Sequence, residues 1–96
     1  MNIEESLQGR WVSTDDKASL FFQFPEEDDA WGLMRSEYEG QGKDRDAKIV
    51  YQNSSPHILY RNKGETVETV SEISLISSSR LRLRFPQGWI EFIKAG

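Results

Sequence analysis

The chain has 96 residues, a length typical of one domain, and its 12 lysines and arginines against 16 aspartates and glutamates give a formal net charge of −4. This acidic balance argues against nucleic acid or an anionic membrane as a partner, and no apolar run is long enough to span a bilayer. The absence of cysteine excludes disulfides and cysteine-based sites, the one histidine excludes a histidine-rich metal site, and the 11% aromatic content argues against a disordered chain.

Only the first residues have a helical pattern. Asn2 is a candidate N-cap with Glu5 following it, and Ile3 and Leu7 share one helical face, which predicts a single helical turn. After it, apolar and polar residues alternate and turn residues recur about every eight to twelve positions, which is typical of an all-β sandwich or barrel. We predict strands at about residues 10–14, 18–24, 30–38, 46–52, 57–61, 65–76, 80–85 and 89–94.

Two charged segments fall between the predicted strands. Residues 39–46 hold two glycines and five charged side chains, which predicts a mobile surface loop. The acidic run 26–29 predicts a solvated hairpin tip, because a calcium loop needs alternating ligands and a glycine at the bend.

Turn residues set the register of the later strands. A turn at 63–64, a loop at 77–79 and a turn at 87–88 pair Tyr60 with Val67, Ile58 with Thr69, Leu75 with Leu81, Ile73 with Leu83, Phe85 with Ile90, and Leu83 with Phe92. The three turns agree on one inward face, made of Val67, Ile73, Leu75, Leu81, Leu83, Phe85, Ile90 and Phe92. A loop at 53–56 puts Ile49 and Tyr51 on the same side as Ile58 and Tyr60.

The hairpin formed by the predicted strands 18–24 and 30–38 is left with two possible registers. Alternation places Ala18, Leu20, Phe22 and Phe24 on one face. Their partners are either Trp31 and Leu33, which would also bring Arg35 and Glu37 inside, or Gly32, Met34, Ser36 and Tyr38.

A sequence motif lies at the start of the first strand. The run from Leu7 to Trp11 has the Leu-x-Gly-x-Trp form that opens the first strand of lipocalins and related calycins, and Lys94 in the last strand stands where that family has a basic residue over the tryptophan. The chain therefore resembles a small bacterial lipocalin-like domain. The resemblance implies that residues 1–96 form one eight-stranded antiparallel up-and-down barrel, with Trp11 and Lys94 closing its bottom.

The resemblance also implies a function class, a non-enzymatic protein that holds a small, partly apolar ligand at the open end of its barrel. Tyr51, Tyr60, Thr69 and Ser71 are the candidate ligand contacts, since their hydroxyls suit a polar group of the ligand. The many inward rings, however, favour an interior filled by side chains, with Thr69 and Ser71 at a bend near an open rim.

The outer face of the last strands offers a second function. Arg80, Arg82 and Arg84 form a stripe in which Glu72 and Glu91 are expected to flank Arg84, while Trp89 and Ile93 emerge on the same face. Arginine, tryptophan and isoleucine together have the composition of an interface core. The alternative function is therefore a protein-interaction or inhibitor domain, with Arg82, Arg84, Trp89 and Ile93 as the partner interface. Compact bacterial protease inhibitors resemble the same outline, and a homodimer is the simplest form of this interaction.

Catalysis is not indicated. His57 is expected to face outward with no nucleophile motif near it, and no pair of carboxylates falls in a predicted apolar pocket. We therefore expect no catalytic residue, no metal and no cofactor. The first residues lack a secretory signal, which predicts a cytoplasmic protein if Met1 is the native start and an exported one if a signal was trimmed.

Overall fold

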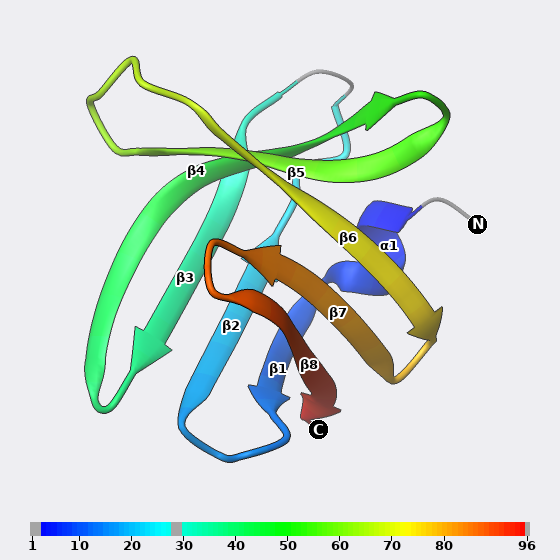
Figure 1. The fold of residues 1–96 in the computed structure, drawn as a ribbon. Coiled ribbons are helices and arrows are strands. Elements are labelled where there is room, and N and C mark those ends of the chain that lie inside the picture. Colours follow the sequence, from blue (N-terminus) through cyan, green and yellow to red (C-terminus); the bar gives the residue numbers. More distant parts are fainter. Residues whose placement is uncertain (1–2, 28–29, 96) are drawn as a thin grey trace.

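The computed structural model describes residues 3–27 and 30–95; Asn2, Asp28 and Asp29, to which a helix cap and part of the acidic run were assigned, lie outside the described residues. The elements in chain order are α1 (Ile3–Leu7), β1 (Gly9–Ser13), β2 (Ala18–Gln23), β3 (Gly32–Tyr38), β4 (Gln41–Gln52), β5 (Ser55–Asn62), β6 (Thr69–Ser77), β7 (Arg80–Phe85) and β8 (Gly88–Ala95). Each strand pairs with the next, and β1 pairs with β8 to close the barrel (Figure 1). The predicted eight-stranded antiparallel up-and-down barrel with a short N-terminal helical turn is confirmed.

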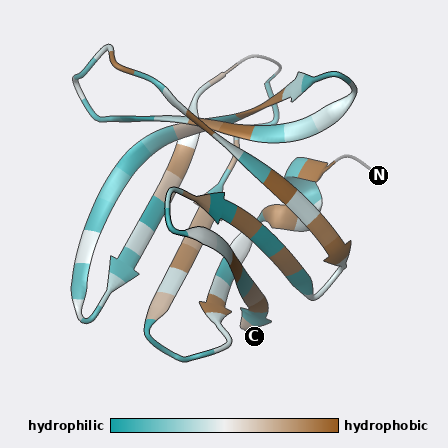
Figure 2. Cartoon of the chain, in the orientation of Figure 1, coloured by the Kyte–Doolittle hydropathy of each residue, from teal (hydrophilic) through white to brown (hydrophobic). Residues whose placement is uncertain are grey.

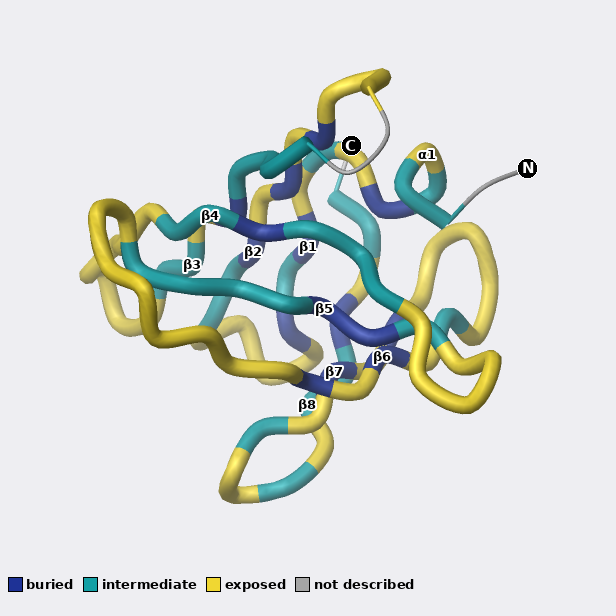
Figure 3. Tube along the Cα trace, turned by 90° about the horizontal axis from the view of Figure 1, so that it is seen from above, coloured by how far each residue is buried: buried dark blue, intermediate teal, exposed yellow. Residues whose placement is uncertain are grey.

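The core follows from the period-two alternation of the strands. Apolar and polar residues alternate along β7 and neighbouring strands, so that one face of each strand lines the barrel (Figure 2). The buried residues fall along the strands and at the end of α1, whereas the hairpin tips are exposed (Figure 3). The buried apolar residues are Leu7, Trp11, Leu20, Phe22, Phe24, Met34, Ala47, Ile58, Ile73, Leu81, Leu83 and Phe92.

The β2–β3 hairpin adopts the register that keeps the charged side chains outside the barrel. Phe22 pairs with Met34 and Leu20 with Ser36, so the side chains of Arg35 and Glu37 lie on the outer face. There Arg35 forms ion pairs with Glu37 and with Asp44 of β4, both at 3.3 Å. Burying these charges without partners would be costly, which gives the physical reason for this register.

The β4–β5 and β7–β8 registers both differ from the prediction by a shift of two residues. Tyr51 lies opposite Pro56, because the β4–β5 turn consists of Asn53 and Ser54, both of which have positive φ. In the same way Leu83 lies opposite Ile90, because Pro86 takes the first turn position. A shift of two residues preserves the face, so the inward residues of β7 and β8 were predicted although their partners were not. The predicted pairs Leu75 with Leu81 and Ile73 with Leu83 are confirmed.

The predicted loop at residues 39–46 is wrong. It shrinks to a turn at Glu39 and Gly40, both with positive φ, and residues 41–46 extend β4 instead. Every residue from Gln41 to Ala47 pairs with β3. The charged residues of this segment were interpreted as the signal of a loop. In a strand, however, successive side chains point to opposite faces, so charges of alternating sign are separated onto the two faces.

The predicted tight turn at residues 63–64 is also wrong. β6 begins only at Thr69, so the connection from β5 is longer and Ile58 pairs with Ser71 rather than with Thr69. Val67 lies in this connection and is 74% exposed, although it was predicted to point inward. Residues 63–68 belong to no strand, and Gly64 among them has a positive φ. Alternation alone therefore overestimated the length of β6.

One end of the barrel is closed by α1 and Trp11. The Trp11 ring is fully buried and its indole N–H donates to the carbonyl of Leu7 at 2.9 Å. Lys94 places its ammonium 4.8 Å from the centre of the Trp11 ring and donates to the carbonyls of Ser6 and Gln8. The last carbonyls of α1, which a helix leaves unpaired, are thereby satisfied by the two residues that were predicted to close the barrel.

Gly9 joins this closure to the first strand. Its φ is +103°, and the Lys94 ammonium lies 3.4 Å from where a Cβ would stand. Gln8 extends the ladder beyond β2, since its side-chain amide pairs with both the N–H and the carbonyl of Phe24. Burial of the ammonium lowers the pKa of Lys94 below its usual range.

The closure makes a prediction about stability. We expect Trp11→Ala to lower the free energy of unfolding by about 3–5 kcal/mol, because it removes a fully buried ring and leaves a cavity under Lys94. Trp89→Ala is the matched control, since Trp89 is 44% exposed, and it should cost less than about 1 kcal/mol. Urea denaturation measures both. Equal losses for the two variants would contradict the role assigned to Trp11.

Candidate functional site

A cavity of about 550 Å³ opens at the end of the barrel opposite α1. Residues of the hairpins that join β1 to β2, β3 to β4 and β7 to β8 form its rim, and the core residues Leu20, Ile58 and Leu83 lie deeper in its lining. The volume falls within the range of about 300–1,000 Å³ that is usual for small-molecule sites. The interior is therefore filled near α1 and hollow at the other end, so each of the two sequence-based expectations applies to one half of the barrel.

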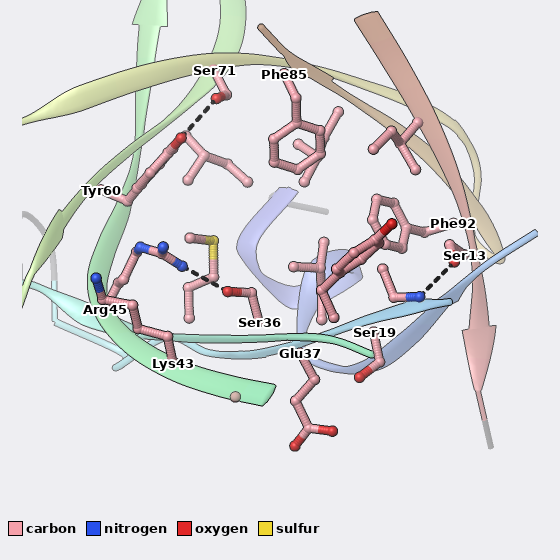
Figure 4. Close-up of a pocket in the computed structure, with 18 of the residues that line it drawn as sticks. Ser13, Ser19, Ser36, Glu37, Lys43, Arg45, Tyr60, Ser71, Phe85 and Phe92 are labelled. Carbon is pink, nitrogen blue, oxygen red and sulfur yellow. Dashed lines mark hydrogen bonds between the residues drawn. The ribbon is translucent and has the colours of Figure 1, made fainter. Parts of the chain in front are cut away.

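The cavity has one polar and one apolar wall (Figure 4). Strands β3, β4 and β5 supply Ser36, Lys43, Arg45 and Tyr60 on one side. Strands β7 and β8 supply Phe85, Ile90 and Phe92 on the other. A molecule that fills this space would meet charge and hydroxyls on one side and rings on the other.

Arg45 is the central residue of the polar wall. Its guanidinium donates to the Ser36 hydroxyl at 2.6 Å and lies 5.9 Å from the centre of the Tyr60 ring. The Ser71 hydroxyl is 3.5 Å from the Tyr60 oxygen, a long hydrogen bond that leaves the Tyr60 O–H as a donor toward the cavity. Arg45, Ser36 and Tyr60 thus present several donors in one place.

Strand β4 sorts its charges by face. Asp44 and Asp46 point outward, where they pair with Arg35 and Arg61 at 3.3 Å and 3.2 Å. Lys43 and Arg45 lie on the cavity face, with Lys43 exposed at the rim and Arg45 partly buried, and no carboxylate of the described residues forms an ion pair with either. The cavity wall therefore carries two cations whose charge the described part of the chain does not neutralise.

Two acids also lie at the cavity, but both are engaged elsewhere. The Glu37 side chain points away from the cavity and pairs with Arg35 (Figure 4). Asp15 sits at the rim, where it accepts a hydrogen bond from the Ser13 hydroxyl at 2.6 Å and one from the N–H of Lys17 at 3.1 Å. These hydrogen bonds, chiefly that from Ser13, lower the pKa of Asp15 below its ordinary value of 3.8.

Two of the predicted ligand contacts, Tyr60 and Ser71, line the cavity. Thr69 pairs directly with Tyr60 in the β5–β6 ladder, but it is exposed at the start of β6 and is not one of the residues that line the cavity. Tyr51 is 61% exposed and lines a different hollow, which residues of α1 also line, toward the closed end of the barrel. Tyr60 pairs with Ala47, so Tyr51 lies farther from Tyr60 along the β4–β5 ladder than predicted and outside the cavity that Tyr60 lines.

The predicted outer stripe is present with different pairings. Glu91 forms ion pairs with Arg80 at 3.6 Å and Arg82 at 3.3 Å, not with Arg84. Arg84 instead lies 5.9 Å from the centre of the Trp89 ring. Trp89 and Ile93 are 44% and 40% exposed, and the charged Glu91 lies between them on β8. The outer face thus alternates apolar and charged residues along the strand.

Two features were missed or misplaced by sequence reasoning. Trp31 lies outside the core, with the Lys48 ammonium 4.7 Å and the Arg61 guanidinium 4.1 Å from its ring centre. His57 was expected at the surface, but it is 9% exposed and its Nδ1 lies 2.9 Å from the carbonyl of Ser55. Neither has an arrangement suited to catalysis.

Two features are absent from the part of the chain that the structure describes. Within residues 3–27 and 30–95, no three histidine or acidic side chains gather closely enough to hold a metal ion. In the same part of the chain no helix has the length and apolar character needed to cross a membrane. Comparison of the chain with models of protein families, with curated proteins and with solved structures finds no match.

The rim gives a prediction about pH. A carboxyl group whose pKa is lower in the folded than in the unfolded chain stabilises the fold above its unfolded pKa, and this contribution is lost as the pH falls through the folded pKa. We expect Asp15→Ala to be less stable than the wild type at neutral pH, and the difference to shrink below pH 3.8. Urea denaturation across this range measures it, with Glu68→Ala as the removal of another exposed carboxylate. A difference that stays constant with pH would contradict this role.

Proposed function

We propose that the protein is a non-enzymatic binding protein that holds a small, partly apolar ligand in the open end of its barrel. The observation that carries this proposal is the cavity of about 550 Å³ between an apolar wall and a polar wall. A barrel of eight strands is just wide enough either to be filled or to hold one small ligand, and here the filled part ends below the cavity. The likeness of the Leu7–Trp11 motif and of Lys94 to the lipocalin pattern supports the same proposal.

The arrangement of the two barrel ends also supports ligand binding. Trp11, Lys94 and α1 hold one end closed without any help from a ligand. The rim at the other end is made of hairpins that contribute exposed tips, such as Glu39 and Gly40, and few core residues. A ligand can therefore enter and leave at one end while the core at the other end keeps the fold intact.

Ser71 provides a test of the cavity. Ser71 is buried and lines the cavity, whereas Ser74 of the same strand is exposed on the outer face. We expect Ser71→Phe to block binding of the neutral apolar fluorophore Nile red, because the new ring occupies the cavity, and Ser74→Phe to leave binding unchanged. Fluorescence titration measures binding, and thermal melting shows whether each variant is folded.

Native mass spectrometry of the protein purified from its source cells complements this test. A mass excess that matches one small molecule, lost in Ser71→Phe, is the expected result. If Nile red binds the wild type and both folded variants equally, the cavity is not the binding site.

The second candidate function is docking through the outer face of β8. Its supporting observation is that Trp89 and Ile93 remain 44% and 40% exposed on one face of the strand. For a homodimer built on this face, we expect the wild type to sediment as a dimer and Trp89→Ala as a monomer. A wild type that sediments as a monomer at high concentration would remove the homodimer form of this function.

A further inference from the structure

We infer that the cavity selects a compact monocarboxylate with an apolar body, and that Arg45 binds its carboxylate. This inference rests on the proposed function, since it names the ligand class of the same cavity. Arg45 of β4 carries it, with Ser36 and Tyr60 beside the guanidinium and Phe85 and Phe92 across the cavity (Figure 4).

The charge of the ligand follows from the sorting of charges on β4. The outward carboxylates of Asp44 and Asp46 are each paired with an arginine. The inward cations Arg45 and Lys43 form no ion pair with a carboxylate of the described residues, and Arg45 is only partly exposed. A partly buried, unpaired guanidinium favours a negative charge that enters the cavity.

The geometry of the donors favours a carboxylate. The guanidinium is a planar fork that matches the two oxygens of a carboxylate, and one of its nitrogens already donates to the Ser36 hydroxyl at 2.6 Å. That bond fixes the guanidinium in the wall and leaves its other N–H groups for a ligand. The Ser71 hydroxyl donates to the Tyr60 oxygen, and the O–H of Tyr60 therefore offers a further donor. Arg45 is the partly buried cation of the wall and has neutral hydroxyls around it, whereas Lys43 is exposed at the rim. The partly buried part of the site therefore suits a single negative charge.

The apolar wall sets the rest of the ligand. Phe85, Ile90 and Phe92 face the polar wall, and the floor beneath is made of Leu20, Ile58 and Leu83. An apolar body that spans from Arg45 toward this wall would bury its surface against rings and branched side chains. The volume of about 550 Å³ limits the ligand to a compact molecule. The polar group therefore lies at the side of the cavity, and not at its floor, where Ile58 and Leu83 are almost fully buried.

The test separates the head group from the apolar body. Decanoate and decanol share the apolar chain and differ in charge, and isothermal titration calorimetry with the full chain measures their affinities. We expect decanoate to bind the wild type about ten- to a hundredfold more tightly than decanol. This factor is what a charge-assisted hydrogen bond typically contributes to an affinity. Arg45→Gln should remove this difference, because it removes the charge and the fork, and should leave the affinity for decanol unchanged.

Arg35→Gln is the matched control. Arg35 lies on the adjacent strand but on the outer face, and its removal changes the net charge by the same amount. We expect it to leave the affinity for decanoate unchanged. Arg45→Lys serves as a second variant should Arg45→Gln fail to fold, and it should keep part of the preference for decanoate.

The outcomes separate this inference from the proposed function. Equal affinities of decanoate and decanol for the wild type would overturn the role of Arg45, while binding of both in the cavity would uphold the proposed function. A preference for decanoate that persists in Arg45→Gln and disappears in Arg35→Gln would also overturn it. Absence of any binding, with no change in the amide NMR signals of the residues around Tyr60, would overturn both.

Discussion

The contact of Lys94 with Trp11 and the end of α1 is the constraint on which the barrel depends. β1 and β8 are far apart in sequence, and their pairing places Trp11 directly opposite Lys94. A cation over an indole is worth about 0.5–2 kcal/mol, and a cation at a helix C-terminus about 0.3–1 kcal/mol. The same ammonium makes both interactions and also satisfies carbonyls of Ser6 and Gln8. One side chain thus joins the helix, the first strand and the last strand.

This closure explains why the two barrel ends differ. At the closed end Trp11, Phe22 and Phe24 fill the interior, and the Phe22 and Phe24 rings stack with their centres 5.6 Å apart. Toward the other end the inward positions of β3 and β4 hold Ser36, Arg45 and Lys43 in place of large apolar residues. Polar side chains of this kind keep their polar atoms near water and do not close the barrel. The hollow end is therefore a consequence of composition along β3 and β4.

The sequence predicted the fold better than the site, because the two depend on different signals. Alternation has a period of two, so a register error of two residues, as at Tyr51 and Leu83, leaves the inward face unchanged and the barrel correct. A site depends on the position of a residue along the barrel axis, and the same error placed Tyr51 two residues, about 7 Å, too close to Tyr60. Tyr60 and Ser71 were predicted because alternation places both on the inward face.

Arg45 was missed because its segment resembles a loop. Residues 43–46 read Lys-Asp-Arg-Asp, and dense charge beside Gly40 and Gly42 is a common signal of an exposed connection. The alternation of charge sign in these four residues was the signal that could have located it. In a strand, alternation sends both cations to one face and both carboxylates to the other, as the ion pairs of Asp44 and Asp46 show.

The sorting of charge on β4 does not serve the stability of the barrel. An inward carboxylate beside Arg45 would neutralise it within the chain, and an apolar side chain at that position would add to the core, since buried ion pairs rarely stabilise a fold more than apolar packing does. Among the described residues Arg45 forms no ion pair with a carboxylate, and its guanidinium donates to the Ser36 hydroxyl and lies near the Tyr60 ring. The fold thus tolerates a partly buried cation that it does not need. The unpaired guanidinium lowers the stability of the empty barrel. A ligand that brings a negative charge would explain why it is kept, because the same guanidinium then contributes to binding.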